Sequence, residues 1–145
     1  MTHHFLLEPG QWLGEGEITF STSPDQIRFY TRWEIEKGEH QGLDLIQQVE
    51  LQDVEDHVHN RYSLFAIQEQ SFEIALENEH IGTVMGKGVI DQEKLAWEFR
   101  EQKGFEGFEI YQLTGEDTYS FHAEYLSGEH FRTLIDGRIW RKTEN

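Results

Sequence analysis

Apolar and polar side chains alternate along most of this chain. Between residues 27 and 36, the odd positions read Ile, Phe, Thr, Trp and Ile, and the even positions read Arg, Tyr, Arg, Glu and Glu. Residues 12–20, 72–77, 119–125 and 131–141 follow the same two-residue period. Successive side chains of a strand point to opposite faces, so this pattern predicts half-buried antiparallel strands.

Short clusters of glycine, acidic and amide residues separate these segments, at intervals of about 10–14 residues. Examples are Lys37-Gly38-Glu39, Glu77-Asn78-Glu79 and Ser127-Gly128-Glu129. The spacing predicts about ten strands joined by tight turns. Closing such a meander into a barrel removes its two edges and encloses its apolar face. A sandwich is the competing architecture, but its crossovers need longer connections than this chain offers.

We therefore predict one all-β domain over residues 1–145, a closed antiparallel up-and-down β-barrel. Two segments fit this assignment less well. Residues 43–54 alternate weakly and could form a helix, and residues 91–103 contain side chains that a helix tolerates. We favour a strand for 91–103, because Leu95, Trp97 and Phe99 share one parity.

The charge of the chain limits its partners. Lys and Arg number 12 and Asp and Glu number 28, which gives a net charge of −16. Phosphate backbones and anionic lipids repel such a surface, so we expect neither nucleic acid nor a membrane as a partner. Cysteine is absent, which excludes disulfides and a thiolate nucleophile. The N-terminal residues lack the features of a signal peptide, so we expect a soluble, cytoplasmic protein whose first residues, His3 and His4 included, fray.

The start of the first predicted strand carries a family resemblance. Gly10-Gln11-Trp12 resembles the Gly-x-Trp signature of the calycin superfamily, which includes lipocalins and fatty-acid-binding proteins. The longer string from Gly10 to Glu17 resembles the opening of nitrobindin-like barrels. The resemblance implies a lipocalin-like barrel in which an arginine of the last strand stacks on Trp12. We expect Arg141, rather than Arg138, to take this closing role.

A barrel of this size can hold a ligand among its inward side chains. We predict non-catalytic binding of a small hydrophobic molecule, with Arg61 and Arg132 as candidate polar contacts. Alternatively, the rings fill the barrel and the protein has a structural or interaction role. No nucleophile elbow, phosphate-binding loop or zinc-protease motif occurs, which favours binding over catalysis. The predicted aromatic lining consists of Phe29, Trp33, Trp97, Tyr111, Phe121 and Tyr125.

The resemblance to nitrobindin-like barrels implies a second candidate ligand. In those proteins a histidine near the C-terminus ligates haem iron, and His130 is the nearest position in this chain. A haem protein with redox or nitrogen-oxide chemistry is therefore the alternative function. The pair His57-Val58-His59 has a spacing found in metal sites, but it lies in an acidic segment typical of a solvated turn. We predict no cofactor other than this haem candidate and no bound metal.

Overall fold

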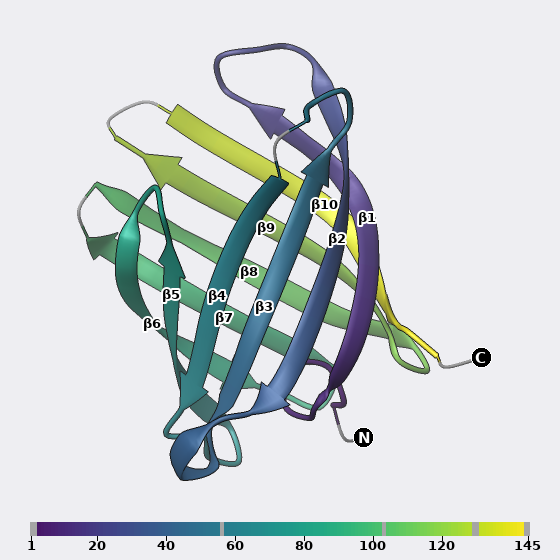
Figure 1. Ribbon diagram of the computed structural model, residues 1–145, viewed down its shortest axis with the longest axis vertical. Coiled ribbons are helices and arrows are strands. Elements are labelled where there is room, and N and C mark those ends of the chain that lie inside the picture. Colours follow the sequence, from purple (N-terminus) through teal and green to yellow (C-terminus); the bar gives the residue numbers. More distant parts are fainter. Residues whose placement is uncertain (1–2, 56, 103, 129–130, 144–145) are drawn as a thin grey trace.

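Ten antiparallel strands close into a barrel in the computed structural model (Figure 1). The structure describes residues 3–55, 57–102, 104–128 and 131–143. A single 3-10 turn, Glu39–Gln41, interrupts the connection between β2 and β3. The predicted closed barrel is confirmed. Its strands are β1 (Gly10–Phe20), β2 (Gln26–Lys37), β3 (Leu43–Leu51), β4 (His57–Phe65), β5 (Ser71–Asn78), β6 (Gly82–Ile90), β7 (Lys94–Gln102), β8 (Phe105–Gly115), β9 (Thr118–Ser127) and β10 (Phe131–Arg141).

The first and last strands form the closing seam. β1 pairs with β10 over nine positions, from Trp12 opposite Arg141 to Phe20 opposite Thr133. Gly16 lies opposite Gly137 at the middle of the seam. A Cβ atom on Gly16 would lie 2.1 Å from the carbonyl oxygen of Asp136, so this position accepts no side chain without a backbone shift.

Both segments with ambiguous patterns are strands. β3 pairs with β2 and β4, and β7 pairs with β6 and β8, so neighbouring strands satisfy the backbone of each. Leu95, Trp97 and Phe99 point inward from β7 and are all at most 2% exposed. The two-residue period therefore predicted the strand correctly here, although the composition of the segment also tolerates a helix.

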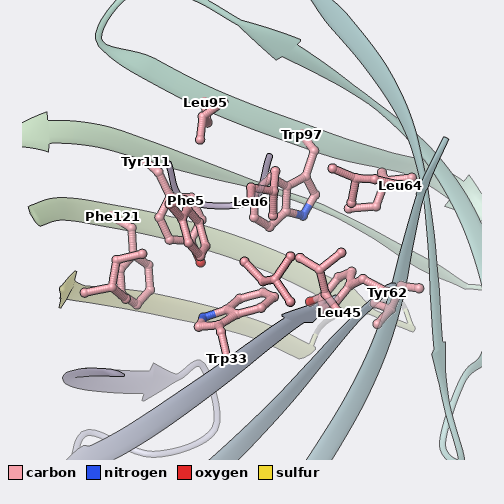
Figure 2. Packing of buried hydrophobic residues seen from close by; sticks show 14 of the residues in the cluster. Phe5, Leu6, Trp33, Leu45, Tyr62, Leu64, Leu95, Trp97, Tyr111 and Phe121 are labelled. Atoms are coloured by element: carbon pink, nitrogen blue, oxygen red, sulfur yellow. The ribbon is translucent and has the colours of Figure 1, made fainter. Parts of the chain in front are cut away.

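The interior of the barrel has a closed end, where residues 3–7 fold across the opening. We name this segment the N-terminal plug. Phe5 and Leu6 are completely buried, and Figure 2 shows them among Trp33, Trp97 and Tyr111. The Phe5 ring centroid lies 5.0 to 5.6 Å from four other ring centroids, those of Tyr111, Trp12, Trp33 and Tyr119.

The plug is anchored through His3, which is 4% exposed. Its Nε2 lies 2.5 Å from the carbonyl oxygen of Asp91, which can only accept, so Nε2 carries the proton. Its Nδ1 then accepts a hydrogen bond from the Tyr119 hydroxyl at 2.7 Å. His4 bonds to the Asp117 carboxylate at 2.6 Å. The expectation that these histidines fray is wrong, because long-range hydrogen bonds and burial of Phe5 hold the segment in place.

Charged side chains cover much of the outer wall. Glu15 on β1 accepts hydrogen bonds from Arg28 on β2 and from Arg138 on β10. This network crosses the closing seam on its outer side. No helix among the described residues is long and apolar enough to cross a membrane.

Candidate functional site

A cavity of about 260 Å³ occupies the end of the barrel opposite the N-terminal plug. We name this end the mouth; the odd-numbered strands end there and the even-numbered strands begin there (Figure 1). Phe20, Leu51, Val58 and Thr133 are only half-buried, because the cavity reaches solvent at this end. Its lining consists of Ile18, Phe20, Phe29, Gln47, Val49, Leu51, Val58, Asn60, Tyr62, Leu76, Asn78, Phe105, Glu109, Phe121, Tyr125, Thr133 and Ile135.

A buried carboxyl group lies at the floor of the cavity. Glu109 projects inward from β8 and is 6% exposed. The Tyr111 hydroxyl donates to its Oε1 at 2.8 Å, and the Tyr125 hydroxyl donates to its Oε2. Tyr62, from β4 on the far wall, also lines the cavity, and it acts to lower the pKa of Glu109. We name Glu109, Tyr62, Tyr111 and Tyr125 the floor cluster.

The electrostatics of the floor cluster follow from burial. Removal from water raises the pKa of Glu109 above its usual value, and the tyrosine hydrogen bonds oppose that rise without cancelling it. Burial and the neighbouring Glu109 carboxylate raise the pKa values of Tyr62, Tyr111 and Tyr125 far above the usual range. These hydroxyls therefore remain protonated donors. The described lining contains no Lys, Arg or His, so no basic side chain shares the cavity with this carboxyl.

A row of amide side chains runs across β3, β4 and β5 on another wall. Asn78 donates to Asn60 at 3.0 Å, Asn60 to Gln47 at 2.9 Å, and Gln47 to Thr31 on β2 at 3.2 Å. We name these four residues the amide ladder. The Asn78 Oδ1 accepts the backbone N–H groups of His80 and Ile81, both at 2.9 Å. This fixes the orientation of the Asn78 amide and, in turn, that of each amide below it.

The predicted aromatic residues divide between two levels of the barrel. Phe29, Phe121 and Tyr125 line the cavity. Trp33 and Trp97 lie deeper, packed between the cavity and the plug, and are at most 2% exposed. Tyr111 connects the two levels. Its ring stacks between those of Trp97 and Phe121, with centroid distances of 5.1 and 4.9 Å, and its hydroxyl donates a hydrogen bond to Glu109.

The two predicted arginine contacts lie outside the barrel. Arg61 is exposed on the outer wall, because its neighbours Asn60 and Tyr62 take the inward positions of β4. Arg132 points outward from β10 and pairs with Glu124, which also accepts a hydrogen bond from His122 at 2.8 Å. Neither guanidinium faces the cavity, so these residues do not serve as its polar contacts.

Trp12 closes the barrel through different partners from those expected. It is 1% exposed, and its ring packs edge-on against Phe5 and Tyr119 at 5.2 and 5.8 Å. Arg141 is its direct partner across the seam, but the Arg141 guanidinium lies 3.6 Å from the Asp117 carboxylate. Among the described residues, the arginine stacked on a tryptophan is Arg138, over Trp140 on the outer wall. The plug supplies the aromatic cover that the resemblance assigned to an arginine.

The polar residues of the cavity are not among the predicted site residues, although the alternation along the chain contains a signal for them. Along β8 the inward row reads Phe105, Gly107, Glu109 and Tyr111, and Glu109 is its only charged member. Gln47, Asn60 and Asn78 likewise occupy inward positions of apolar rows. A polar residue in an otherwise apolar row is a candidate for a ligand-facing group, because it is costly to bury without a partner.

The described lining does not fit haem. Haem iron is held in proteins by His, Cys, Met or Tyr; the described lining offers only Tyr62 and Tyr125, and the Tyr125 hydroxyl already donates to Glu109. His130, the haem-ligand candidate, lies outside the described residues. His57 and His59 stack on each other on the outer wall, exposed to solvent. Within the described ranges, no group of three or more His, Asp or Glu side chains is placed to hold a metal ion.

Comparisons with known proteins concern the fold alone. No family model matches this chain, and no curated protein sequence matches it. The crystal structure of Rv2717c from M. tuberculosis is similar over 93% of this chain and 92% of that chain, with a TM-score of 0.72 and 14% identity. The S-type phycobiliprotein lyase CPES from Guillardia theta is similar over 94% of this chain and 89% of that chain, with a TM-score of 0.72 and 7% identity. Together with its closed antiparallel topology, these likenesses show that the chain shares the barrel fold of these two proteins.

Proposed function

We propose that this protein binds a small, mainly hydrophobic molecule in the barrel cavity, without catalysing a reaction. The observation that carries the proposal is the cavity itself, which opens at the mouth and is lined mostly by aliphatic and aromatic side chains. Binding sites for small molecules are typically concave and apolar, with a few convergent polar groups. The floor cluster and the amide ladder supply such groups.

The volume of the cavity restricts the ligand. At about 260 Å³, it lies just below the range of about 300–1,000 Å³ that is usual for drug-sized ligands. A single-ring or short branched molecule suits this space. The two similar structures lend no activity to the proposal, because identities of 14% and 7% support the fold alone.

Saturable binding of a neutral single-ring probe, benzyl alcohol, followed by isothermal titration calorimetry, tests the proposal. We expect one site per chain, and we expect Val58→Trp to abolish binding, because Val58 lines the cavity and a large ring there would fill it. Val89→Trp is the matched control, because Val89 is 59% exposed on the outer wall and lies away from the cavity. Circular dichroism checks that both variants keep the barrel.

Two results would contradict the proposal. One is the absence of saturable binding by folded protein, which would favour the packed barrel with a structural or interaction role. The other is equal loss of binding in both variants, which would place the probe outside the cavity. The described residues give no observation that favours haem chemistry as a second function.

A further inference from the structure

We infer that the cavity takes a small organic cation, a protonated amine on an apolar body, with its ammonium group against Glu109. This inference rests on the proposed function and adds the class of ligand. It stands on the placement of one buried acidic group, on the absence of basic groups from the described lining, and on the charge of the molecule as a whole.

The first step concerns hydrogen-bonding capacity. An ionised carboxylate has about four acceptor positions, and hydrogen bonds from Tyr111 and Tyr125 occupy two of them. Both neighbours donate, and neither carries a positive charge. A ligand group that both donates a hydrogen bond and carries a positive charge would therefore complete the site, and an ammonium group does both.

The second step concerns the sign of the charge. A carboxylate taken out of water is costly unless a cation accompanies it. Glu109 is 6% exposed, and among the described lining residues no basic side chain performs this role. An anionic ligand, such as a fatty acid, would place two like charges in one apolar cavity. A neutral alcohol could form the hydrogen bond but would leave the charge of Glu109 uncompensated.

The third step concerns the approach of the ligand. The net charge of the chain is −16. The turns around the mouth add acidic side chains, with Asp25 between β1 and β2, Asp53 and Glu55 between β3 and β4, and Glu79 between β5 and β6. A surface and an entrance of one sign raise the local concentration of ligands of the opposite sign. The field outside the barrel and the carboxyl inside it thus select the same charge.

Three probes with nearly the same body separate these possibilities: phenethylamine, phenethyl alcohol and phenylacetate. Isothermal titration calorimetry near neutral pH and low salt measures their affinities for the intact chain. We expect the amine to bind about tenfold or more tightly than the alcohol, because only the amine adds a positive charge to its hydrogen bond with the carboxylate. We expect phenylacetate to bind more weakly than either.

Glu109→Gln tests whether this carboxyl is the cause. Glutamine keeps the shape and can still hydrogen-bond to the tyrosines, whose hydroxyls can donate or accept. We expect the variant to bind the alcohol within about threefold of the wild type and to lose its preference for the amine. Glu106→Gln is the matched control, because it removes an equal charge from an exposed outward position on the same strand; it should retain the preference.

The outcomes distinguish this inference from the proposed function. If none of the three probes binds the wild type, the proposed function fails together with the inference. If the alcohol binds as tightly as the amine, or phenylacetate binds most tightly, the cavity binds small molecules but the inference is overturned. A preference for the amine that survives Glu109→Gln also overturns it. If Glu109→Gln does not fold, the ranking of the three probes on the wild type decides.

Discussion

The two ends of the barrel interior use similar side chains in different ways. At the closed end, Phe5, Trp12, Trp33 and Trp97 pack ring against ring with at most 2% exposure. At the mouth, Phe20, Val49 and Leu51 are only partly buried around an open space. The closed end thus resembles the core of a globular domain, whereas the mouth keeps a cavity.

Polar atoms follow a different rule at each end. The indole N–H groups of Trp33 and Trp97 are buried without a hydrogen-bond partner among the described residues, and the surrounding apolar contacts must offset that cost. At the mouth, two tyrosines of the floor cluster donate hydrogen bonds to Glu109. Separately, hydrogen bonds of the amide ladder join Gln47, Asn60 and Asn78. The comparison teaches that the closed end stabilises the barrel, and that the mouth places polar groups where a ligand can reach them.

The largest effect should come from Trp12→Ala at the closed end. We expect a loss of about 3–5 kcal/mol in the free energy of unfolding, because a large buried ring leaves a cavity that its neighbours cannot fill. Phe20→Ala at the mouth is the comparison, and its loss should stay below about 2 kcal/mol because Phe20 is already partly exposed. Urea unfolding followed by circular dichroism measures both. Equal losses would refute the distinction between the two ends.

An added methyl group should show how little space the closed end has. A Cβ atom on Gly88 of β6 would lie 2.0 Å from the ring of Phe72, which is 2% exposed. We expect Gly88→Ala to destabilise the protein by about 1–3 kcal/mol, because the ring must move within a packed core. Gly115→Ala is the control, since nothing lies within 4 Å of its added Cβ atom; its effect should stay within about 0.5 kcal/mol. A neutral Gly88→Ala would mean that the core has room to adjust.

Glu109→Gln should raise stability at neutral pH by about 1 kcal/mol. Burial raises the pKa of Glu109 in the folded state above its usual value of 4.5. The protein therefore binds this proton more tightly when folded, and the resulting stabilisation is lost as pH rises through the raised pKa. The advantage of the variant should shrink on acidification towards pH 4.5. Unfolding curves at several pH values measure it, and a pH-independent difference would contradict the assignment.

The smallest effect should come from the outer wall. His122 lies between Glu124 at 2.8 Å and Asp136 at 2.6 Å, and these carboxylates raise its pKa above 6.5. The stabilisation is present below pH 6.5 and is lost as pH rises through the raised pKa. Because 39% of the side chain is exposed, solvent screens the pair, and His122→Gln should cost well under about 1 kcal/mol. His59→Gln is the control, because His59 is exposed on β4. If it lost more stability than His122→Gln, the carboxylates beside His122 would not explain the effect of His122→Gln.

The fold could be predicted from the sequence because the barrel is periodic. Alternation in 27–36 and 95–99 follows directly from the pleat of a strand, and short turns leave closure as the simplest way to remove the edges. The seam was also accessible, since Gly10-Gln11-Trp12 marks the first strand. Each of these signals is local, and most strands of the barrel repeat the alternation.

The rest depends on contacts that no local pattern encodes. Phe5 and Leu6 precede the first strand, so no period assigns them to the core, and only the closed barrel creates the opening that they fill. Arg61 and Arg132 are predicted polar contacts because the inward parity of their strands is ambiguous in the sequence, but the pairing of these strands turns both side chains to solvent. Glu109 was counted among the many acidic residues, although its inward position in β8 distinguishes it.

The plug imposes an order on the folding of the chain. Tyr119, the partner of His3, follows it by 116 positions in the sequence, and β1 pairs with the last strand of the barrel. Contacts this distant in sequence slow folding, because much chain entropy is lost before they form. Until β10 is synthesised, β1 remains an unpaired sheet edge, and such edges favour aggregation. An affinity tag on the C-terminal side, which leaves the plug residues unencumbered, should therefore suit production of this protein better than one on the N-terminal side.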